Sequence, residues 1–384
     1  MYDTIVLKSP YIYSQKLIER LFQYMRMTRG VNLYNGEILY EFTNGELQGS
    51  YDYRIRLNLK DYEWKNELGI PEKIKTDYYI EVECSVHKLM MNHNCYGGPN
   101  KIIESIKYII MFLENCIDNS MPVWYEWEVK RIDIAYIYRF ENDEEIRQYL
   151  FKLKNIYYSR RGIGWPTTGT GFYINGSTTT VKGYMKYPEF IRNDYKRIKK
   201  YCLKMRDIEI GSSREIVYNK VLEEIENIKE NVKGIFRIEV EIHKRKIEEI
   251  FACNVKNLND EMLNEIFEKE LGKIFWDIGD EENMVNKSYD VVNRLNLVYG
   301  ETLGRTLYGT WSMLATFGKK EVREKLSKST YYRHLKLIAE AGCIWDITDL
   351  SNNNNSNVII FRPCIKNADN KVDNKVEEKL RMVI

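Results

Sequence analysis

The sequence predicts an α+β protein, in which a mainly antiparallel sheet with flanking helices precedes a small C-terminal module of three helices and a β-hairpin. Strand-like and helix-like segments interleave without the regular βαβ rhythm of a parallel sheet. Several strand-like segments alternate polar and apolar residues, which is typical of strands with one polar face. Near the C-terminus, three helix-like segments precede two short strand-like ones.

Composition sets limits on the class of protein. The chain has 384 residues, 44% of them hydrophobic and 30% charged, which is enough for two or three domains with cores of their own. It has no run of eighteen apolar residues and no signal-peptide pattern at its start, so we expect no membrane partner and a cytoplasmic location. A net charge of +2 argues against a generally basic DNA-coating protein.

The chain divides into four predicted parts. We expect an α+β domain over residues 1–245, a helical connector over 246–298, a separate module over 299–365 and a flexible tail over 366–384. The expected strands of the first part, besides the four described next, are Tyr53–Leu59 and Gly171–Asn175. The expected helices are Pro99–Cys116, Asp143–Lys152 and Glu215–Glu230 in the first part and Asn259–Phe275 in the connector.

Four predicted strands each carry polar residues on one face: Ile80–Ser85, Val129–Ala135, Val181–Lys186 and Ile235–Ile242. Successive strand side chains point to opposite faces, so the alternation groups residues two apart. The groups are Glu81, Glu83 and Ser85; Arg131 and Asp133; Lys182, Tyr184 and Lys186; and Arg237, Glu239 and Glu241. If the strands share a sheet, one face gathers carboxylates, cations and a tyrosine. The alternative is an ordinary solvent-exposed sheet face.

A polar face of this kind contains the parts of a DNA-nicking site. Carboxylates suit Mg²⁺ or Mn²⁺, which polarises a scissile phosphate. A tyrosine with a pKa of about 10 needs activation by a metal or by nearby cations before it can attack phosphorus. Lys182 and Lys186, two positions either side of Tyr184, would activate it and hold the phosphate. Arg131 and Arg237 would contact DNA.

Basic residues cluster between Lys182 and Arg206, where a predicted helix would offer a stripe of cations to phosphates, including Lys196 and Lys200. A solvated helix face, balanced by the acidic stretch Glu223–Glu230, explains the same charges.

The C-terminal module has the plan of a winged helix-turn-helix. Its expected helices are Gly309–Phe317, Lys320–Leu326 and Ser327–Ala341, and its expected hairpin strands are Cys343–Ile347 and Val358–Arg362. In that plan the third helix enters the major groove. The residues expected to face DNA are Ser329, Thr330, Tyr331, Arg333, His334 and Lys336, with Asn352–Asn355 touching a flanking groove. A winged helix used for protein contacts is the alternative.

Four segments occur in the order of a known family: VECSVHKLMMNHN, WEVKRIDIA, TGFYINGSTTTVKGYMKYPEF and FRIEVEIHKRKI. Together they resemble the replication initiators of filamentous phages, of the gene-II/gene-X type, and more loosely the plasmid rolling-circle initiators. The resemblance covers roughly residues 80–246.

The resemblance implies a nicking-joining enzyme. Such a protein binds a double-stranded origin, nicks one strand, stays attached through a 5′-phosphotyrosine, and leaves a 3′-OH that primes synthesis. It implies that Tyr184 is the nucleophile. It also implies that Asp133, Glu239 and either Glu83 or Glu241 hold the metal.

The chain departs from many rolling-circle enzymes in its histidines. None of His87, His93, His243 and His334 forms a pair two residues apart, so a carboxylate metal site is preferred. Tyr173 and Tyr187 compete with Tyr184, and a second tyrosine from the basic helix is open.

Three functions stay open: the nicking initiator, a non-cleaving origin-binding initiator or repressor, and a metal-dependent nuclease that uses water. No GxxxxGK[ST] loop is present, so strand separation would need a host helicase. Single-stranded DNA is a further expected partner, and formation of a homodimer stays open.

Overall fold

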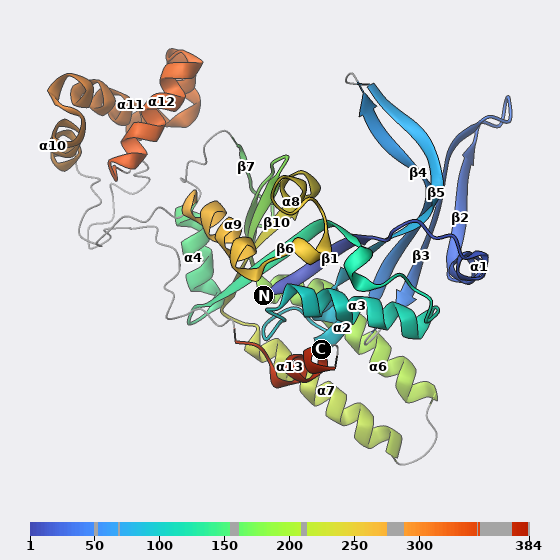
Figure 1. Ribbon diagram of the computed structural model, residues 1–384. Coiled ribbons are helices and arrows are strands. Elements are labelled where there is room, and N and C mark those ends of the chain that lie inside the picture. Colours follow the sequence, from blue (N-terminus) through green and yellow to red (C-terminus); the bar gives the residue numbers. More distant parts are fainter. Residues whose placement is uncertain are drawn as a thin grey trace. The chain divides into compact units, whose positions relative to one another are not determined.

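The computed structural model describes residues 1–49, 53–67, 70–153, 161–208, 213–274, 288–343, 345 and 371–382. The chain forms two compact units, one from residues 1–146, 163–268 and 365–384, the other from residues 147–162 and 269–364 (Figure 1). Among the described residues, no helix is both long enough and apolar enough to cross a bilayer.

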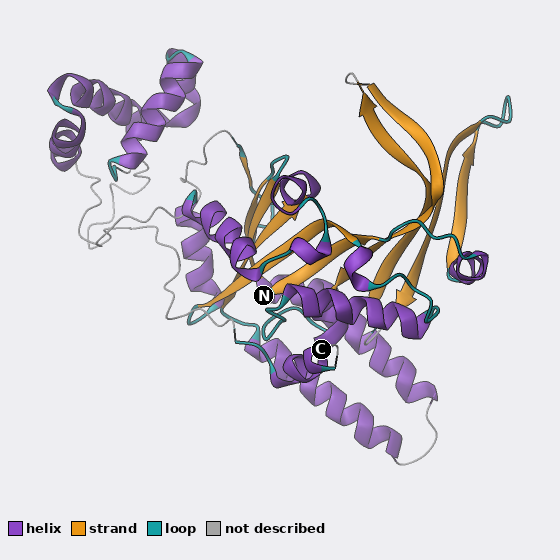
Figure 2. Cartoon of the chain, in the orientation of Figure 1, coloured by secondary structure: helices purple, strands orange, loops and turns teal. Residues whose placement is uncertain are grey.

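The first unit is built on one antiparallel sheet, as expected (Figure 2). In the described residues the strand order is β2-β3-β4-β5-β1-β6-β10-β9-β8-β7. The strands are β1 Tyr2–Lys8, β2 Met25–Val31, β3 Ile38–Gln48, β4 Arg54–Glu67, β5 Ile70–Ser85, β6 Glu128–Arg139, β7 Ile163–Gly164, β8 Gly171–Ile174, β9 Thr179–Met185 and β10 Ile235–His243. The four strands predicted to carry polar faces therefore share one sheet, joined by the N-terminal strand β1.

Helices pack around this sheet and close its core. Buried isoleucines at every third or fourth position of α3 give it an apolar stripe, and α3 packs against β1. On α9 the ring of Phe267 lies 4.3 Å from the ring of Tyr136 on β6. The helices of this part of the chain are α1 Gln15–Gln23, α2 Val86–Met91, α3 Ile102–Cys116, α4 Asp143–Leu153, α5 Lys186–Phe190, α6 Lys196–Ile208, α7 Ser213–Asn231, α8 Lys244–Phe251 and α9 Asp260–Gly272.

Strand β6 contains a bulge at the centre of the sheet. On β1, Val6 lies opposite Arg131, but the next residue, Leu7, lies opposite Val129. Lys130 is therefore an extra residue, which shifts the side-chain alternation of β6 by one position. Val129 and Ile132 are both fully buried on the apolar face, while Arg131 and Asp133 stay on the polar face.

The far edge of the sheet opens into two long hairpins. Pairing between β3 and β4 stops at Thr43 and Leu59. The β4–β5 ladder continues to Glu67 and Ile70, and the β2–β3 ladder continues to Val31. The two hairpins separate beyond that point (Figure 2).

The predicted flexible tail contains a helix that docks on the first unit. Helix α13 (Asn374–Arg381) contacts α2 and α3, with Val376 and Leu380 buried. The backbone N–H of Asp373 donates to Gly97, and the side chain of Lys379 donates to Met90. The expectation of a flexible tail is wrong for residues 371–382, because two apolar side chains at helical spacing give this segment a face to bury.

The second unit contains the three predicted helices: the first two lie in α11 Glu301–Lys325, and the third is α12 Lys328–Glu340. A further helix, α10 Ser288–Tyr299, precedes them within the predicted connector. Gly318 has a φ of +76° and kinks α11 between the first two predicted helices. Ser327 caps α12, because its hydroxyl accepts from the N–H of Thr330 at 3.2 Å. The predicted hairpin strands, and with them Asn352–Asn355, lie almost wholly outside the described residues.

Candidate active site

The register of the central strands brings the predicted residues onto one face. Arg237 of β10 lies opposite Tyr184 of β9, and Glu239 lies opposite Lys182. On the other side of β10, Glu241 lies opposite Asp133 of β6. Residues directly opposite each other in an antiparallel pair point to the same face. We call this surface of β5, β1, β6, β10 and β9 the polar face.

Tyr184 is tied to a carboxylate from the neighbouring strand. Its hydroxyl donates to Oε1 of Glu239 at 2.7 Å, and Nε of Arg237 donates to the same oxygen at 2.6 Å. Burial raises the pKa of Tyr184 well above its usual range, and the charge of Glu239 acts in the same direction. The phenol is therefore protonated in this state, with an acceptor already in place for its proton.

Gly171, on the neighbouring strand β8, leaves space for Tyr184. It lies opposite Tyr184 in the β8–β9 ladder. A Cβ at this position would lie 2.6 Å from the carbonyl oxygen of Gly183 and 2.8 Å from the Cβ of Tyr184. The glycine is thus required by close packing.

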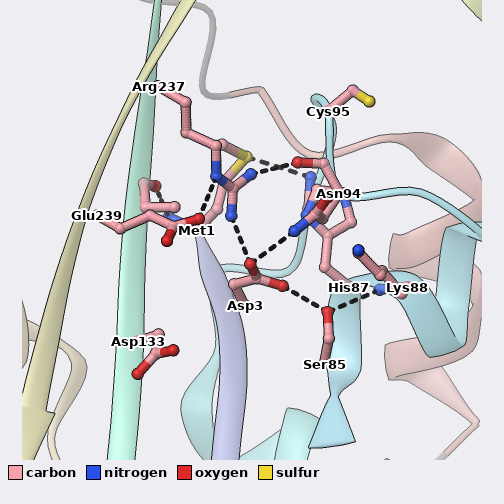
Figure 3. Close-up of polar contacts among 12 residues, drawn as sticks. Met1, Asp3, Ser85, His87, Lys88, Asn94, Cys95, Asp133, Arg237 and Glu239 are labelled. Atoms are coloured by element: carbon pink, nitrogen blue, oxygen red, sulfur yellow. Dashed lines mark hydrogen bonds and ion pairs between the residues drawn. The ribbon is translucent and has the colours of Figure 1, made fainter. Parts of the chain in front are cut away.

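Arg237 is fully buried, so the prediction that it contacts DNA is wrong. Its second guanidinium nitrogen donates to Asp3 at 2.7 Å, and the other donates to the backbone carbonyl of Asn94 (Figure 3). The side chain of Asn94 also donates to Asp3, at 2.7 Å. The loop that follows α2 covers the arginine, and this cover could not be inferred from the alternation of β10.

Lys186 also lies inside the protein. Strand β9 ends at Met185 and Lys186 is the first residue of α5, where its side chain is fully buried. Its ammonium donates to the side-chain oxygen of Asn94 at 2.6 Å and pairs with Glu189. The expected direct contact of Lys186 with a phosphate is therefore wrong in this conformation, although its nitrogen lies 5.8 Å from the centre of the Tyr184 ring.

The remaining residues of the polar face form ion pairs within and between strands. Lys182 pairs with Glu241, and the guanidinium of Arg131 binds both oxygens of Asp133 at 2.9 and 3.0 Å. Arg131 also lies 3.5 Å from Glu83. Glu81 pairs with Lys60 and Lys130, away from Tyr184.

The carboxylates partly fit the predicted metal. No three histidine, cysteine or acidic side chains among the described residues are grouped so as to hold a metal ion. Asp133 and Glu241 nevertheless lie opposite each other, and burial raises the pKa of Asp133 to about 8 against the opposing charge of Arg131. The charges of Glu241 and Glu239 act in the same direction as burial, so a further cation at this position would favour the carboxylate form of Asp133. Oxygen donors in such surroundings match the preference of a hard divalent cation.

Tyr173 of β8 is the competitor that lies on the same side of the sheet as Tyr184. It lies opposite Lys182 and is 42% exposed, more than Tyr184. Tyr187 packs in the apolar cluster between α6 and α7, and Tyr195 donates its hydroxyl to Glu226 at 2.6 Å. Of the predicted nucleophile and its two competitors in neighbouring segments, Tyr184 and Tyr173 therefore lie on the same side of the sheet and Tyr187 does not.

In the second unit, two residues predicted to face DNA lie in the core. Tyr331 and His334 are buried, and Nδ1 of His334 lies 2.7 Å from the hydroxyl of Thr310. The prediction is wrong for both, because they continue the helical stripe of Leu335 and Ile338. The other predicted contacts are exposed or half-buried on α12: Ser329, Thr330, Arg333 and Lys336.

The basic helix is confirmed as an element, and its predicted contact residues are accessible. Lys196 and Lys200 are exposed one turn apart on α6. Their contact with phosphates stays a prediction.

Two residues of the site were missed from the sequence. Asp3 is an acid inside the apolar run of β1, and such an isolated acid was a usable signal. Asn94 lies in an irregular loop, and nothing in its neighbours in the sequence points to Arg237 or Lys186.

Comparisons with known proteins show what this chain is similar to. A family model described as the N-terminal part of a phage replication-associated protein, the gene-II protein, matches residues 1–261. Among solved structures, a rolling circle replication initiator protein from Geobacillus stearothermophilus is similar, with 14% identity over 73% of this chain and 89% of that chain and a TM-score of 0.30. No curated protein gives a significant match.

Proposed function

We infer the function from one premise: the chain belongs to the family of phage replication-associated proteins of the gene-II type, whose model matches residues 1–261. We propose that it initiates rolling-circle replication by nicking one strand of a double-stranded origin with Tyr184. The product is a 5′-phosphotyrosine on the protein and a free 3′-OH that primes synthesis.

One observation carries the choice of nucleophile. The hydroxyl of Tyr184 donates to Glu239 at 2.7 Å on a face that also bears Lys182, Arg131 and the acidic pair Asp133 and Glu241. A nucleophile within hydrogen-bonding reach of a base, which a third group orients, is the usual arrangement for covalent catalysis. Here Arg237 is the orienting group.

The proposed step balances as a transesterification. The phenolic oxygen of Tyr184 bonds to phosphorus as its proton passes to Glu239, and the bond from phosphorus to the 3′ oxygen breaks. The 3′ oxygen leaves, takes a proton from water and becomes the primer end. In the joining reaction a 3′-OH attacks the phosphotyrosine and gives its proton to water, the bond from phosphorus to the Tyr184 oxygen breaks, and Glu239 returns the proton to Tyr184.

Asp133, Glu241, Glu239 and Glu83 are the residues that would hold Mg²⁺ or Mn²⁺. The bound cation would polarise the scissile phosphate and stabilise the charge that develops on it. Arg131, which now neutralises Asp133, would then turn to the phosphate together with Lys182. Lys186 acts indirectly, through Asn94 and Asp3, by keeping Arg237 in place.

Recognition of the origin is assigned to other surfaces. A winged helix in the second unit would bind duplex DNA through Ser329, Thr330, Arg333 and Lys336, and α6 would contact phosphates through Lys196 and Lys200. A host helicase would supply single-stranded DNA, and dimerisation on the origin stays a prediction.

Transfer of label from DNA to protein tests the nucleophile. A single-stranded origin oligonucleotide, labelled on the 3′ side of the nick, is incubated with the protein and Mg²⁺ or Mn²⁺. Label that resists denaturation is expected on the wild-type chain and on Tyr173→Phe, and none on Tyr184→Phe. A chelator should abolish transfer in every case.

The pair of tyrosine variants makes the outcome decisive. Both remove one hydroxyl from the same face, so a general effect of lost polarity would appear in both. Transfer that persists in Tyr184→Phe but fails in Tyr173→Phe would move the nucleophile to Tyr173. Cleavage without any adduct would favour a nuclease that uses water.

A non-cleaving origin-binding protein is the second candidate. The observation that favours it is that the candidate metal ligands Asp133, Glu241 and Glu83 each already face a cationic side chain. Tight binding to origin DNA, with neither a nick nor an adduct in the presence of Mg²⁺ or Mn²⁺, would support this candidate.

A further inference from the structure

A hollow on the same side of the sheet as the polar face lies at the other end of the sheet from Tyr184. It has a volume of about 690 Å³ over β2, β3 and β4, and arginines Arg26, Arg54 and Arg56 line it. All three are exposed. The side chain of Arg56 is 68% exposed and approaches Glu83 at 3.6 Å, so most of its guanidinium faces solvent.

Two exposed aromatic rings share the face of this hollow. Tyr40 and Phe42 of β3 stack with their ring centres 6.0 Å apart and their planes at 13°. They are 56% and 43% exposed. Tyr40, Phe42 and Asn44 alternate on one side of β3, and Asn44 lies opposite Arg26. The rings and the arginines therefore point to the same side of the sheet.

The hollow joins the candidate active site along the sheet. Arg56 lies opposite Glu83, and Val6 of β1 lies opposite both Glu83 and Arg131. Ion pairs link Arg56 to Glu83, Glu83 to Arg131 and Arg131 to Asp133. From β4 to β9 there are five strand spacings of about 4.8 Å, or roughly 24 Å in all. One continuous polar surface connects the two places.

We propose that the hollow and the Tyr40–Phe42 platform bind a single DNA strand and lead it to Tyr184. Guanidinium groups suit phosphate oxygens, and exposed rings suit the faces of unpaired bases. Duplex DNA keeps its bases stacked on one another, so it gains nothing from the rings. The inference rests on the proposed function, since it names the path of the strand that Tyr184 cuts.

Salt-dependent binding tests the arginines. Tyr184→Phe protein, which cannot form the adduct, is titrated with a fluorescent single-stranded oligonucleotide at several salt concentrations. The combined change Arg26→Gln, Arg54→Gln and Arg56→Gln is expected to reduce the slope of log Kd against log salt by about 2, at about 0.7 for each phosphate that the protein ceases to neutralise.

A matched control comes from the opposite side of β2. Arg29 pairs with Glu41 across the β2–β3 ladder, one strand position out of phase with Arg26. Arg29→Gln removes the same charge from the same hairpin, and its slope is expected to equal that of the parent protein. If Arg29→Gln and Arg26→Gln, each alone, reduced the slope equally, the proposed DNA path would be wrong and only a general effect of charge would remain.

The rings have their own test. Tyr40→Ala with Phe42→Ala is expected to weaken binding of single-stranded DNA about tenfold, and to change binding of an abasic strand little. Unchanged affinity of this variant for normal single-stranded DNA would overturn the proposal. If the variant instead changed only the sedimentation coefficient of the protein, the platform would be assigned to protein contacts. The failure of Tyr184 as nucleophile would appear only as missing label transfer, so the two hypotheses fail separately.

Discussion

Arg237 is the residue that holds the polar face in its observed form. It is fully buried and binds two carboxylates, Asp3 and Glu239, as well as the carbonyl of Asn94. A buried ion pair gives little net stability compared with apolar packing, but removing one partner leaves an uncompensated charge. Here the loss of one cation would leave two such charges, one of which accepts the hydroxyl of Tyr184.

Replacing Arg237 should therefore affect stability and catalysis together. Arg237→Met is expected to lower the free energy of unfolding by about 3–5 kcal/mol, measured by urea denaturation. Arg29→Met, which breaks the exposed ion pair of Arg29 with Glu41, is expected to cost about 1 kcal/mol or less. Similar losses in the two variants would contradict the role given to the buried arginine.

At the scale of elements, α12 separates residues that build the core from residues that face solvent. Tyr331, His334 and Ile338 are buried, whereas Arg333 and Lys336 are exposed on the opposite side of the helix. If α12 is a recognition helix, only the exposed side can touch a groove.

Arg333→Ala is expected to weaken binding of duplex origin DNA about tenfold and to leave cleavage of a pre-melted single strand largely intact. Gel-shift titration and the label-transfer assay measure the two effects. Arg323→Ala, which removes an exposed arginine of α11, serves as the control. Equal loss in binding and cleavage would argue against the division of labour between the units.

Strand and helix periodicity in the sequence predicted which residues share a face, but not what covers that face. Glu239, Lys182 and Asp133 lie where two-residue alternation places them, because antiparallel register preserves it. Arg237 and Lys186 differ. A loop distant in sequence covers Arg237, and strand β9 ends one residue before Lys186. For Tyr331 and His334 the signal was present, because their spacing to Leu335 and Ile338 already continued the predicted core stripe.

At the scale of the whole chain, its last described helix belongs to the same unit as its first strand. Residues 365–384 return to the unit formed by residues 1–146 and 163–268, after the chain has built most of the second unit. The docked helix α13 buries Val376 and Leu380 against elements near residues 86–116. The first unit therefore contains α13 as well as β1.

Leu380→Ala should lower the free energy of unfolding by about 2–4 kcal/mol, since it removes buried apolar volume. Met382→Ala, two residues later, removes a side chain that is 73% exposed and should change stability little. Thermal and urea unfolding of the full chain compare the two. A negligible effect of Leu380→Ala would mean that α13 is not docked in solution.

The extra residue in β6 gives one short segment two phases of alternation. Before Lys130, odd-numbered residues such as Val129 face the core, and after it the even-numbered Ile132 and Ile134 do. Deleting Lys130 would bring the two halves into a single phase, so that either Val129 would be turned outward or Asp133 and Arg131 would be turned into the apolar layer. A length change of one residue here would therefore be more damaging than most substitutions. The bulge at Lys130 determines which side chains of β6 point to the same face as Tyr184.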